Sequence, residues 1–258
     1  MTRKWLCALG ILFCWVGLEA QQRWLGSSER LLSTDGVVTA FPLPNARSGP
    51  TTIALAQDGT VWFTESAGNR IGRMSPDGTD LKEFPLPNAD SSPRIIALGS
   101  DSNIWFSEFN AGKIGRMTLT GEVTEFALPG ADRGPGDITA GADGNMWFVE
   151  LNGRADNRVV DGNRVGRITM AGQVTEFPMP GGAGSPVNIA VGPDRNIWYT
   201  KGNKLGRVTP DGRITEFDVP GGGTGLTAGS DRAPVGRLVD KLWFAQSGAN
   251  KIAYMSFR

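Results

Sequence analysis

The chain of 258 residues contains no histidine, and its only two cysteines, Cys7 and Cys14, lie among the first twenty residues. Histidine is the side chain whose unperturbed pKa lies nearest neutral pH, so acid–base candidates here are restricted mainly to carboxylates. Beyond residue 20 the chain has no thiol, which excludes a disulfide and a cysteine metal site there.

The chain also has no excess of either charge, because 26 basic residues balance 26 acidic ones. A protein that binds nucleic acid needs a positive field to hold the phosphate backbone. We therefore expect no nucleic-acid partner.

No apolar run in the sequence reaches the roughly 20 residues that a membrane-spanning helix needs. The longest runs from Trp5 to Leu18, after the basic pair Arg3 and Lys4 and just before Ala20. This pattern predicts a secretory signal over residues 1–20, with cleavage after Ala20, and a single domain over residues 21–258. We expect export to the bacterial periplasm or the extracellular space without stable membrane insertion; the alternative is an uncleaved anchor.

What the chain does contain is a repeated tryptophan–aromatic pair. The five pairs lie at intervals of 43, 42, 51 and 45 residues: Trp62-Phe63, Trp105-Phe106, Trp147-Phe148, Trp198-Tyr199 and Trp243-Phe244. A period in the low forties, with one aromatic strand in each unit, is typical of a β-propeller. The sequence thus predicts an all-β fold of four-stranded antiparallel blades, with the tryptophans buried between blades.

Each unit carries four strand signals, and the last unit stops after its third. The missing signal, a Phe-Pro-x-Pro strand, occurs instead at residues 37–44. We predict five blades, closed by this N-terminal strand joining the C-terminal blade, which would leave no sheet edge between the ends. The alternative is six or seven blades, some of them degenerate, with one around Arg23-Trp24-Leu25.

In such a blade, the turn after the second strand and the loop into the first emerge on one face, around the central channel. The residue three positions after each tryptophan belongs to this face, in the order Glu65, Glu108, Glu150, Lys201 and Gln246. Glu65, Glu108 and Glu150 could converge on Mg²⁺ or Ca²⁺, which prefer carboxylate oxygens. Alternatively, each pairs with the basic residue that begins the third strand (Arg70, Lys113 or Arg164) or with Lys201.

The loops into the first strands contribute two charged residues to this face, Arg94 and Asp137. Asp137 is a candidate general base together with Glu108 and Glu150, or else it serves as a hydrogen-bond acceptor in its loop. The third unit also carries an insertion, residues 154–162, on the same face, which either covers a ligand or is merely tolerated. The longer excursion at residues 230–240 falls on the opposite face.

The repeat includes segments such as Asp143-Gly144-Asn145-Met146-Trp147-Phe148-Val149-Glu150 and Asn203-Lys204-Leu205-Gly206-Arg207. On these segments it resembles the repeat of the virginiamycin B (streptogramin B) lyases. The resemblance implies a propeller of a family whose members have seven blades, depend on Mg²⁺ and open cyclic depsipeptides by elimination. It further implies a histidine as general base and glutamates as metal ligands, which would be Glu65, Glu108 and Glu150 here.

The chain departs from that family pattern in two ways. It has five units, and Thr51, Arg94, Gly136 and Val187 stand where the family's histidines are expected. An unperturbed glutamate is a poor base at neutral pH, and losing a general base typically removes a factor of about 10²–10⁴ in rate.

From these observations we expect a monomeric, exported propeller that binds a small molecule or a protein at its channel face. The alternative is a Mg²⁺-dependent lyase or a related hydrolase that uses carboxylates. A six-bladed sugar-lactone hydrolase is a third hypothesis, disfavoured by the number of units.

Overall fold

The computed structural model describes residues 38–130, 133–151, 153–155, 158–160, 162–181, 184–232 and 238–257. The chain divides into two compact units, Met1–Pro42 and Leu43–Arg258, and every described strand lies in the second. In the first unit, residues 38–42 carry no regular secondary structure, and the predicted secretory signal lies outside the described residues. No helix in the described part of the chain is long and apolar enough to cross a bilayer.

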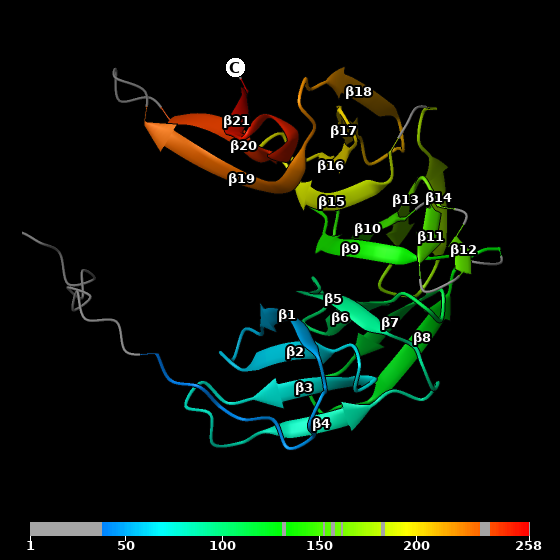
Figure 1. Cartoon of the computed structure of the whole chain (residues 1–258), viewed down its shortest axis with the longest axis vertical. Helices are drawn as coiled ribbons and strands as arrows, with labels where there is room; N and C mark the ends of the chain where they lie inside the picture. The colour runs from blue at the N-terminus through cyan, green and yellow to red at the C-terminus, as the bar shows by residue number, and fades with distance from the viewer. Residues whose placement is uncertain are drawn as a thin grey trace, which may run out of the picture. The chain divides into compact units, whose positions relative to one another are not determined.

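Five of the six described sheets of the second unit are each built around one tryptophan strand (Figure 1). Blade 1 comprises β1 (Pro50–Leu55), β2 (Val61–Glu65), β3 (Arg70–Met74) and β4 (Lys82–Pro85). Blade 2 comprises β5 (Pro93–Leu98), β6 (Ile104–Glu108), β7 (Lys113–Met117) and β8 (Val123–Ala127). Blade 3 comprises β9 (Pro135–Ala140), β10 (Met146–Glu150), β13 (Arg164–Ile168) and β14 (Val174–Pro178).

Blade 4 comprises β15 (Pro186–Val191), β16 (Ile197–Lys201), β17 (Lys204–Val208) and β18 (Ile214–Asp218). Blade 5 has three strands, β19 (Thr224–Arg232), β20 (Leu238–Gln246) and β21 (Lys251–Ser256). The first strands of consecutive blades contact one another, in the order β1, β5, β9, β15 and β19. The predicted all-β propeller of five blades is therefore confirmed.

The predicted closure of the ring is not formed. Residues 38–44 carry no strand, residue 37 lies outside the described residues, and the sheet of blade 5 contains only β19, β20 and β21. The other strands are joined to their partners by short turns, which makes pairing local. The closing strand would have to pair with a segment more than 200 residues away, so no local connection specifies it, and joining such distant segments costs loop-closure entropy.

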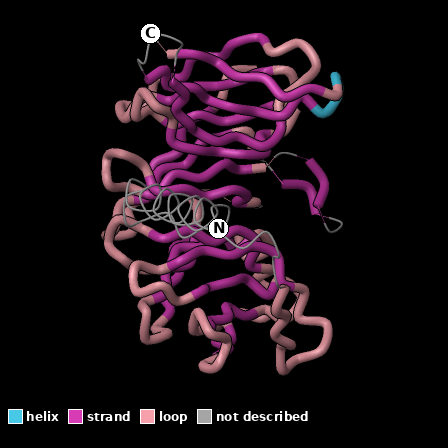
Figure 2. Tube along the Cα trace, turned by 90° about the vertical axis from the view of Figure 1, so that its left-hand side faces the viewer, coloured by secondary structure: helices cyan, strands magenta, loops and turns pink. Residues whose placement is uncertain are grey.

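The insertion in the third unit forms a short hairpin of β11 (Gly153–Ala155) and β12 (Arg158–Val160). It follows the second strand of blade 3, just as the 3-10 turn Ser247–Ala249 follows the second strand of blade 5. Figure 2 shows the hairpin and the turn on the same side of the molecule. The excursion around residues 230–240 instead lengthens the β19–β20 hairpin, whose last paired residues are Arg232 and Leu238.

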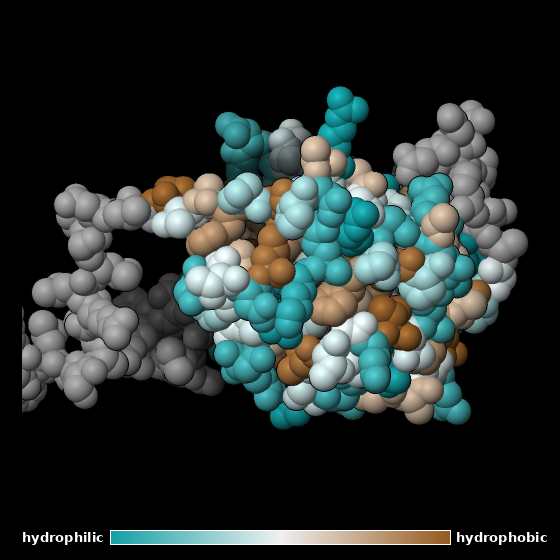
Figure 3. Space-filling model, turned by 90° about the horizontal axis from the view of Figure 1, so that it is seen from below, coloured by the Kyte–Doolittle hydropathy of each residue, from teal (hydrophilic) through white to brown (hydrophobic). Residues whose placement is uncertain are grey.

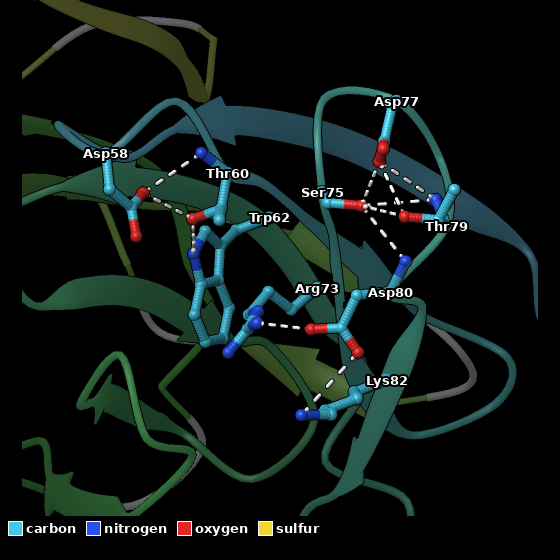
Figure 4. A network of polar contacts seen from close by, with 9 residues as sticks. All are labelled: Asp58, Thr60, Trp62, Arg73, Ser75, Asp77, Thr79, Asp80 and Lys82. Carbon is cyan, nitrogen blue, oxygen red and sulfur yellow. Dashed lines mark hydrogen bonds and ion pairs between the residues drawn. The ribbon is translucent and has the colours of Figure 1, made fainter.

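An aspartate turn explains how the tryptophans of blades 1 to 4 are buried without leaving the indole N–H unsatisfied. In blade 2, Asp101 accepts the backbone N–H of Asn103 (3.1 Å) and the indole N–H of Trp105 (3.0 Å). Asp143 and Asp194 do the same in blades 3 and 4. In blade 1 the link passes through Thr60, which donates to Asp58 and accepts from Trp62 (Figure 4).

The buried tryptophans also stack on the phenylalanine of the fourth strand, with ring centroids 5.6–5.8 Å apart in blades 1 to 4. Apolar clusters then join each blade to the next; for example, Trp62 and Ile71 of blade 1 pack with Ile96 and Phe106 of blade 2. On the face drawn in Figure 3, apolar side chains appear as separate patches among hydrophilic ones. The continuous apolar packing thus lies between the blades.

In blades 1 to 4, the glycine of the third strand makes room for the aromatic residue that follows tryptophan, whereas blade 5 has Ala253 opposite Phe244. A Cβ atom on Gly166 would lie 2.0 Å from the Phe148 ring, and the glycines of the other complete blades meet the same obstacle. This close approach of ring and backbone explains why the third strand reads Ile-Gly-Arg or a close variant.

We predict that Gly166→Ala lowers the free energy of unfolding by about 1–3 kcal/mol, because the new methyl group must displace a buried ring. Urea denaturation measures the change. The matched control is Gly181→Ala, where a Cβ would have no neighbour within 4 Å. Equal stabilities of the two variants would contradict this account of the repeat.

Candidate functional site

The predicted channel-face residues end the second strand of each blade, and most of them are buried. Glu65, Glu108, Glu150 and Lys201 are each at most 1% exposed, whereas Gln246 is partly exposed. Each lies in a different sheet, because each follows a different tryptophan strand.

The three glutamates do not come together as a metal site. Among the residues that the structure describes, no group of three or more histidine, cysteine, aspartate or glutamate side chains is arranged to hold a metal ion. Their burial in separate blades does not fit the shared carboxylate cage predicted from the sequence. Binding of Mg²⁺ itself stays a prediction.

The basic residue that begins each third strand pairs with the glutamate of the fourth strand. The Arg70 Nε–Glu83 Oε2 distance is 3.9 Å in blade 1, and the Lys113 Nζ–Glu125 Oε2 distance is 2.6 Å in blade 2. Glu65 and Glu108 make no ion pair with Arg70 or Lys113; instead, the side chains of Ser48 and Ser91 act on the two carboxyl groups and lower their pKa against the effect of burial. The expectation that Arg70 and Lys113 pair with these two glutamates is therefore wrong: the fourth-strand carboxylate, opposite the glycine of the third strand, is the partner.

Blade 3 contains a second cation, Arg133, which lies between both of its glutamates. Arg133 Nε is 3.4 Å from Glu150 Oε2, and Arg133 Nη2 is 3.3 Å from Glu176 Oε2. Arg164, at the start of β13, is 3.5 Å from the same Glu176 oxygen. Blades 1 and 2 have Ser48 and Ser91 at the position of Arg133, two residues before the proline that opens the first strand.

Blade 4 reverses the charge at the predicted site, because Lys201 replaces the glutamate. Lys201 Nζ donates to the Pro180 carbonyl oxygen (2.6 Å) and lies 3.8 Å from Glu216 Oε1. The Tyr199 hydroxyl donates to the same carboxylate oxygen at 2.8 Å. Gln246 occupies this position in blade 5 and likewise donates to a proline carbonyl, that of Pro220, at 2.7 Å.

Burial makes the unpaired carboxylates hard to ionise. It is the largest cause that raises the pKa of Glu65 and of Glu108, the latter to about 7. Burial also raises the pKa of Glu150, and the neighbouring Glu176 adds to the shift. Blade 2 holds two carboxyl groups, Glu108 and Glu125, around the single cation Lys113, so a proton on Glu108 balances the local charge.

Asp137 joins two blades through hydrogen bonds. Its carboxylate accepts the backbone N–H groups of Ile138 (2.9 Å) and Ile189 (3.0 Å) and the Asn188 side-chain amide (3.3 Å). Burial raises its pKa despite these bonds, which act in the opposite direction. Of the two readings of Asp137, the structure supports the hydrogen-bond acceptor, here one that links β9 to β15.

Arg94 stacks its guanidinium group over the Phe109 ring, 3.6 Å from the centroid. Its carbonyl oxygen accepts from the hydroxyls of Thr52 (2.8 Å) and Thr64 (2.9 Å) of blade 1. Arg94 is therefore integrated into the junction of blades 1 and 2.

Five residues of these networks were missed in the sequence analysis: Glu83, Glu125, Glu176, Glu216 and Arg133. The four glutamates carried a usable signal, since each stands in the Glu-Phe pair of a fourth strand and faces a third-strand glycine across the pairing. No sequence signal identified Arg133, because the residues at the same position of the other units are serine or glycine.

Comparisons with known proteins agree with this fold. The model of the virginiamycin B lyase family matches residues 28–162 and 157–258. The crystal structure of virginiamycin B lyase from Staphylococcus aureus is 38% identical, with a TM-score of 0.74 over 87% of this chain and 74% of that one. A catalytically inactive variant of that lyase, with one histidine replaced by alanine and with quinupristin, is 38% identical, with a TM-score of 0.74 over 87% of this chain and 75% of that one.

A shorter match covers virginiamycin B lyase from Bacillus licheniformis, 42% identical over 41 residues, or 16% of this chain and 14% of that protein. Five blades of repeated tryptophan strands define the chain as a β-propeller. Within that class, it belongs to the virginiamycin B lyase family.

We predict that Glu108→Gln makes the protein less sensitive to pH. The folded protein holds the Glu108 proton up to about pH 7, whereas the unfolded chain releases it near pH 4.5, so this group makes stability fall as pH rises between those values. The variant should therefore gain stability relative to the parent across that window, by on the order of 2 kcal/mol.

Urea denaturation at pH 5 and pH 8 measures this difference. Glu122→Gln, an exposed glutamate of the same blade, is the matched control and should follow the parent at both pH values. Parallel stability curves for Glu108→Gln and the parent would show that Glu108 is ionised throughout.

Proposed function

We propose that this chain is an exported binding propeller of the virginiamycin B lyase family that holds a cyclic peptide ligand without opening it. The observation that carries the proposal is the absence of histidine from the 258 residues of the chain. The related S. aureus lyase is described as catalytically inactive when one histidine is replaced by alanine, and that variant was crystallised with quinupristin. A propeller of this family that lacks a histidine is thus compatible with a bound ligand.

The carboxylates offer little replacement for such a base. A general base must come within hydrogen-bond reach of the proton that it removes. Glu108 and Glu150 are fully buried within their blades, and the Asp137 carboxylate already accepts three hydrogen bonds between blades 3 and 4. None of the three candidate bases is free to approach a ligand at the channel face.

One observation favours the alternative, a Mg²⁺-dependent lyase. Burial raises the pKa of Glu108 to about 7, and a general base works best when its pKa lies near the working pH. This alternative requires the blade to open enough to expose Glu108, and it requires metal ligands other than a cluster of the three glutamates.

We expect the purified chain to bind quinupristin and leave it intact. Mass spectrometry of quinupristin after incubation with the protein and Mg²⁺ measures opening of the ring, and quenching of tryptophan fluorescence measures binding. The S. aureus virginiamycin B lyase, assayed in parallel, is the positive control. Ring opening above the rate of a protein-free sample would overturn the proposal in favour of the lyase, and absence of binding would remove this ligand class.

Calorimetric titration with Mg²⁺ or Ca²⁺ distinguishes the binding propeller from the lyase alternative. The binding propeller needs no metal, and in the described residues the glutamates do not share a site, so this proposal expects no saturable binding. The titration is repeated with Glu108→Gln and with the exposed control Glu122→Gln. One-to-one binding that is lost only in Glu108→Gln would establish a carboxylate metal site and support the lyase alternative.

A further inference from the structure

Blades 3 and 4 neutralise the charges that they bury. Blade 3 combines two carboxylates with two guanidinium groups, and blade 4 combines one carboxylate with one ammonium group. The residues are Glu150, Glu176, Arg133 and Arg164 in blade 3, and Glu216 and Lys201 in blade 4. Since a buried charge that has lost its partner is strongly destabilising, this balance is the expected state of a blade.

One cation of each set occupies the same place in its blade, beside the loop that enters the first strand. Arg133 Nε donates to the Pro129 carbonyl oxygen (2.6 Å), and Lys201 Nζ donates to the Pro180 carbonyl oxygen (2.6 Å). Pro129 and Pro180 stand at the same position of the repeat, so side chains from two different repeat positions bring a positive charge to one place. We call this place, next to the proline carbonyl and the buried carboxylates, the cation position.

Blade 2 has the carboxyl groups but a serine, Ser91, at the repeat position of Arg133. Its two carboxyl groups are those of Glu108 and Glu125, and the cation that acts on Glu108 is Lys113, which donates to Glu125 (2.6 Å). Among the described residues of this blade, the set therefore sums to one negative charge when both carboxyl groups are ionised. Blade 2 is one positive charge short of the balance in blades 3 and 4.

The two carboxyl groups of blade 2 lie together over the third-strand glycine. Glu125 pairs with Gly115 across the strands, and a Cβ atom on Gly115 would lie 2.9 Å from Glu108 Oε1. Glu108 has no exposed surface, and the neighbouring Ser91 hydroxyl donates its one proton to the Asn88 carbonyl oxygen (3.1 Å). With that proton engaged, no described group donates a hydrogen bond to either oxygen of Glu108 or to Glu125 Oε1. Buried carboxyl oxygens without donors, beside a place that other blades fill with a cation, point to a cation there.

We infer that blade 2 binds a monovalent alkali-metal ion, Na⁺ or K⁺, at its cation position, held by oxygen atoms of Glu108, Glu125, Ser91 and the Pro87 carbonyl. Pro87 is the counterpart of the prolines that accept from a cation in blades 3 and 4. One positive charge restores neutrality, which favours a monovalent ion over Mg²⁺ or Ca²⁺. Carboxylate, hydroxyl and carbonyl oxygens are the ligands that hard cations prefer. The side chains of Lys113 and Glu125 are 24% and 13% exposed, so the position lies close beneath the surface, where a small ion can enter.

The inference does not depend on the ends of the chain, because blade 2 is an interior blade whose first strand, β5, contacts both β1 and β9. It is also independent of the proposed function, which concerns a ligand at the channel face. A proton on Glu108 is the competing way to balance the charge, since burial raises the pKa of this group to about 7. The ion and the proton are therefore distinguished above that pH.

Thermal unfolding of the full chain at pH 8 tests the inference. We expect NaCl or KCl to raise the unfolding temperature by about 2–4 °C relative to choline chloride of the same ionic strength, because the large choline ion screens surface charges equally but does not replace a small coordinated ion. Glu108→Gln should lose at least half of this difference, and the exposed control Glu122→Gln should keep it. The loss need only be partial, because blade 1 carries the same charges on Glu65, Glu83 and Arg70. Equal unfolding temperatures in the three salts, or a difference that Glu108→Gln leaves unchanged, would overturn the inference.

Ser91→Arg provides a second readout, because it gives blade 2 a cation of its own in the manner of blade 3. We expect this variant to unfold at a higher temperature than the parent in choline chloride and to respond less to NaCl and KCl. In crystals of the parent soaked in RbCl at pH 8, Rb⁺ should give an anomalous difference peak between Glu108 and Glu125, and this peak should be absent from crystals of Ser91→Arg. A parent crystal without a peak at this position, or a peak that persists in Ser91→Arg, would contradict the assigned site.

Discussion

The contact between the buried tryptophan and the turn before it supports the structure of blades 1 to 4. A buried indole needs a partner for its N–H, and the aspartate turn supplies one at 2.8–3.0 Å in blades 2 to 4 while also fixing the hairpin. The ring is then free to stack on the fourth-strand phenylalanine and to present an apolar face to the next blade. Strand pairing, blade packing and the order of the blades all follow from this one arrangement.

Buried charge is the second constraint, and each blade meets it with its own side chains. Blade 3 balances two glutamates with two arginines, and blade 4 exchanges a glutamate for a lysine beside Glu216. Blades 1 and 2 each keep a buried carboxyl group that forms no ion pair with a described residue, and burial raises its pKa. Because Glu65, Glu108 and Glu150 are fully buried, their oxygens are not accessible to a ligand at the surface of the described fold.

The family relationship therefore concerns the scaffold more than the chemistry. The tryptophan strands, the third-strand glycines and the fourth-strand phenylalanines have structural roles that any propeller of this type requires. The chain shares 38% of its residues with a lyase over 87% of its length.

The sequence by itself determined the all-β class, the five tryptophan strands, their antiparallel order within blades and the burial of the tryptophans. These features follow from short-range periodicity and from turns such as Asp143-Gly144. Only the tertiary structure decided that Lys113 pairs with Glu125, that Asp137 bridges to Asn188, and that residues 38–44 do not complete blade 5. Those outcomes depend on which long side chains meet across strands or between blades, and on the pairing of segments from opposite ends of the chain. No local pattern encodes such long-range contacts, because their energies depend on burial and on competing partners that exist only after folding.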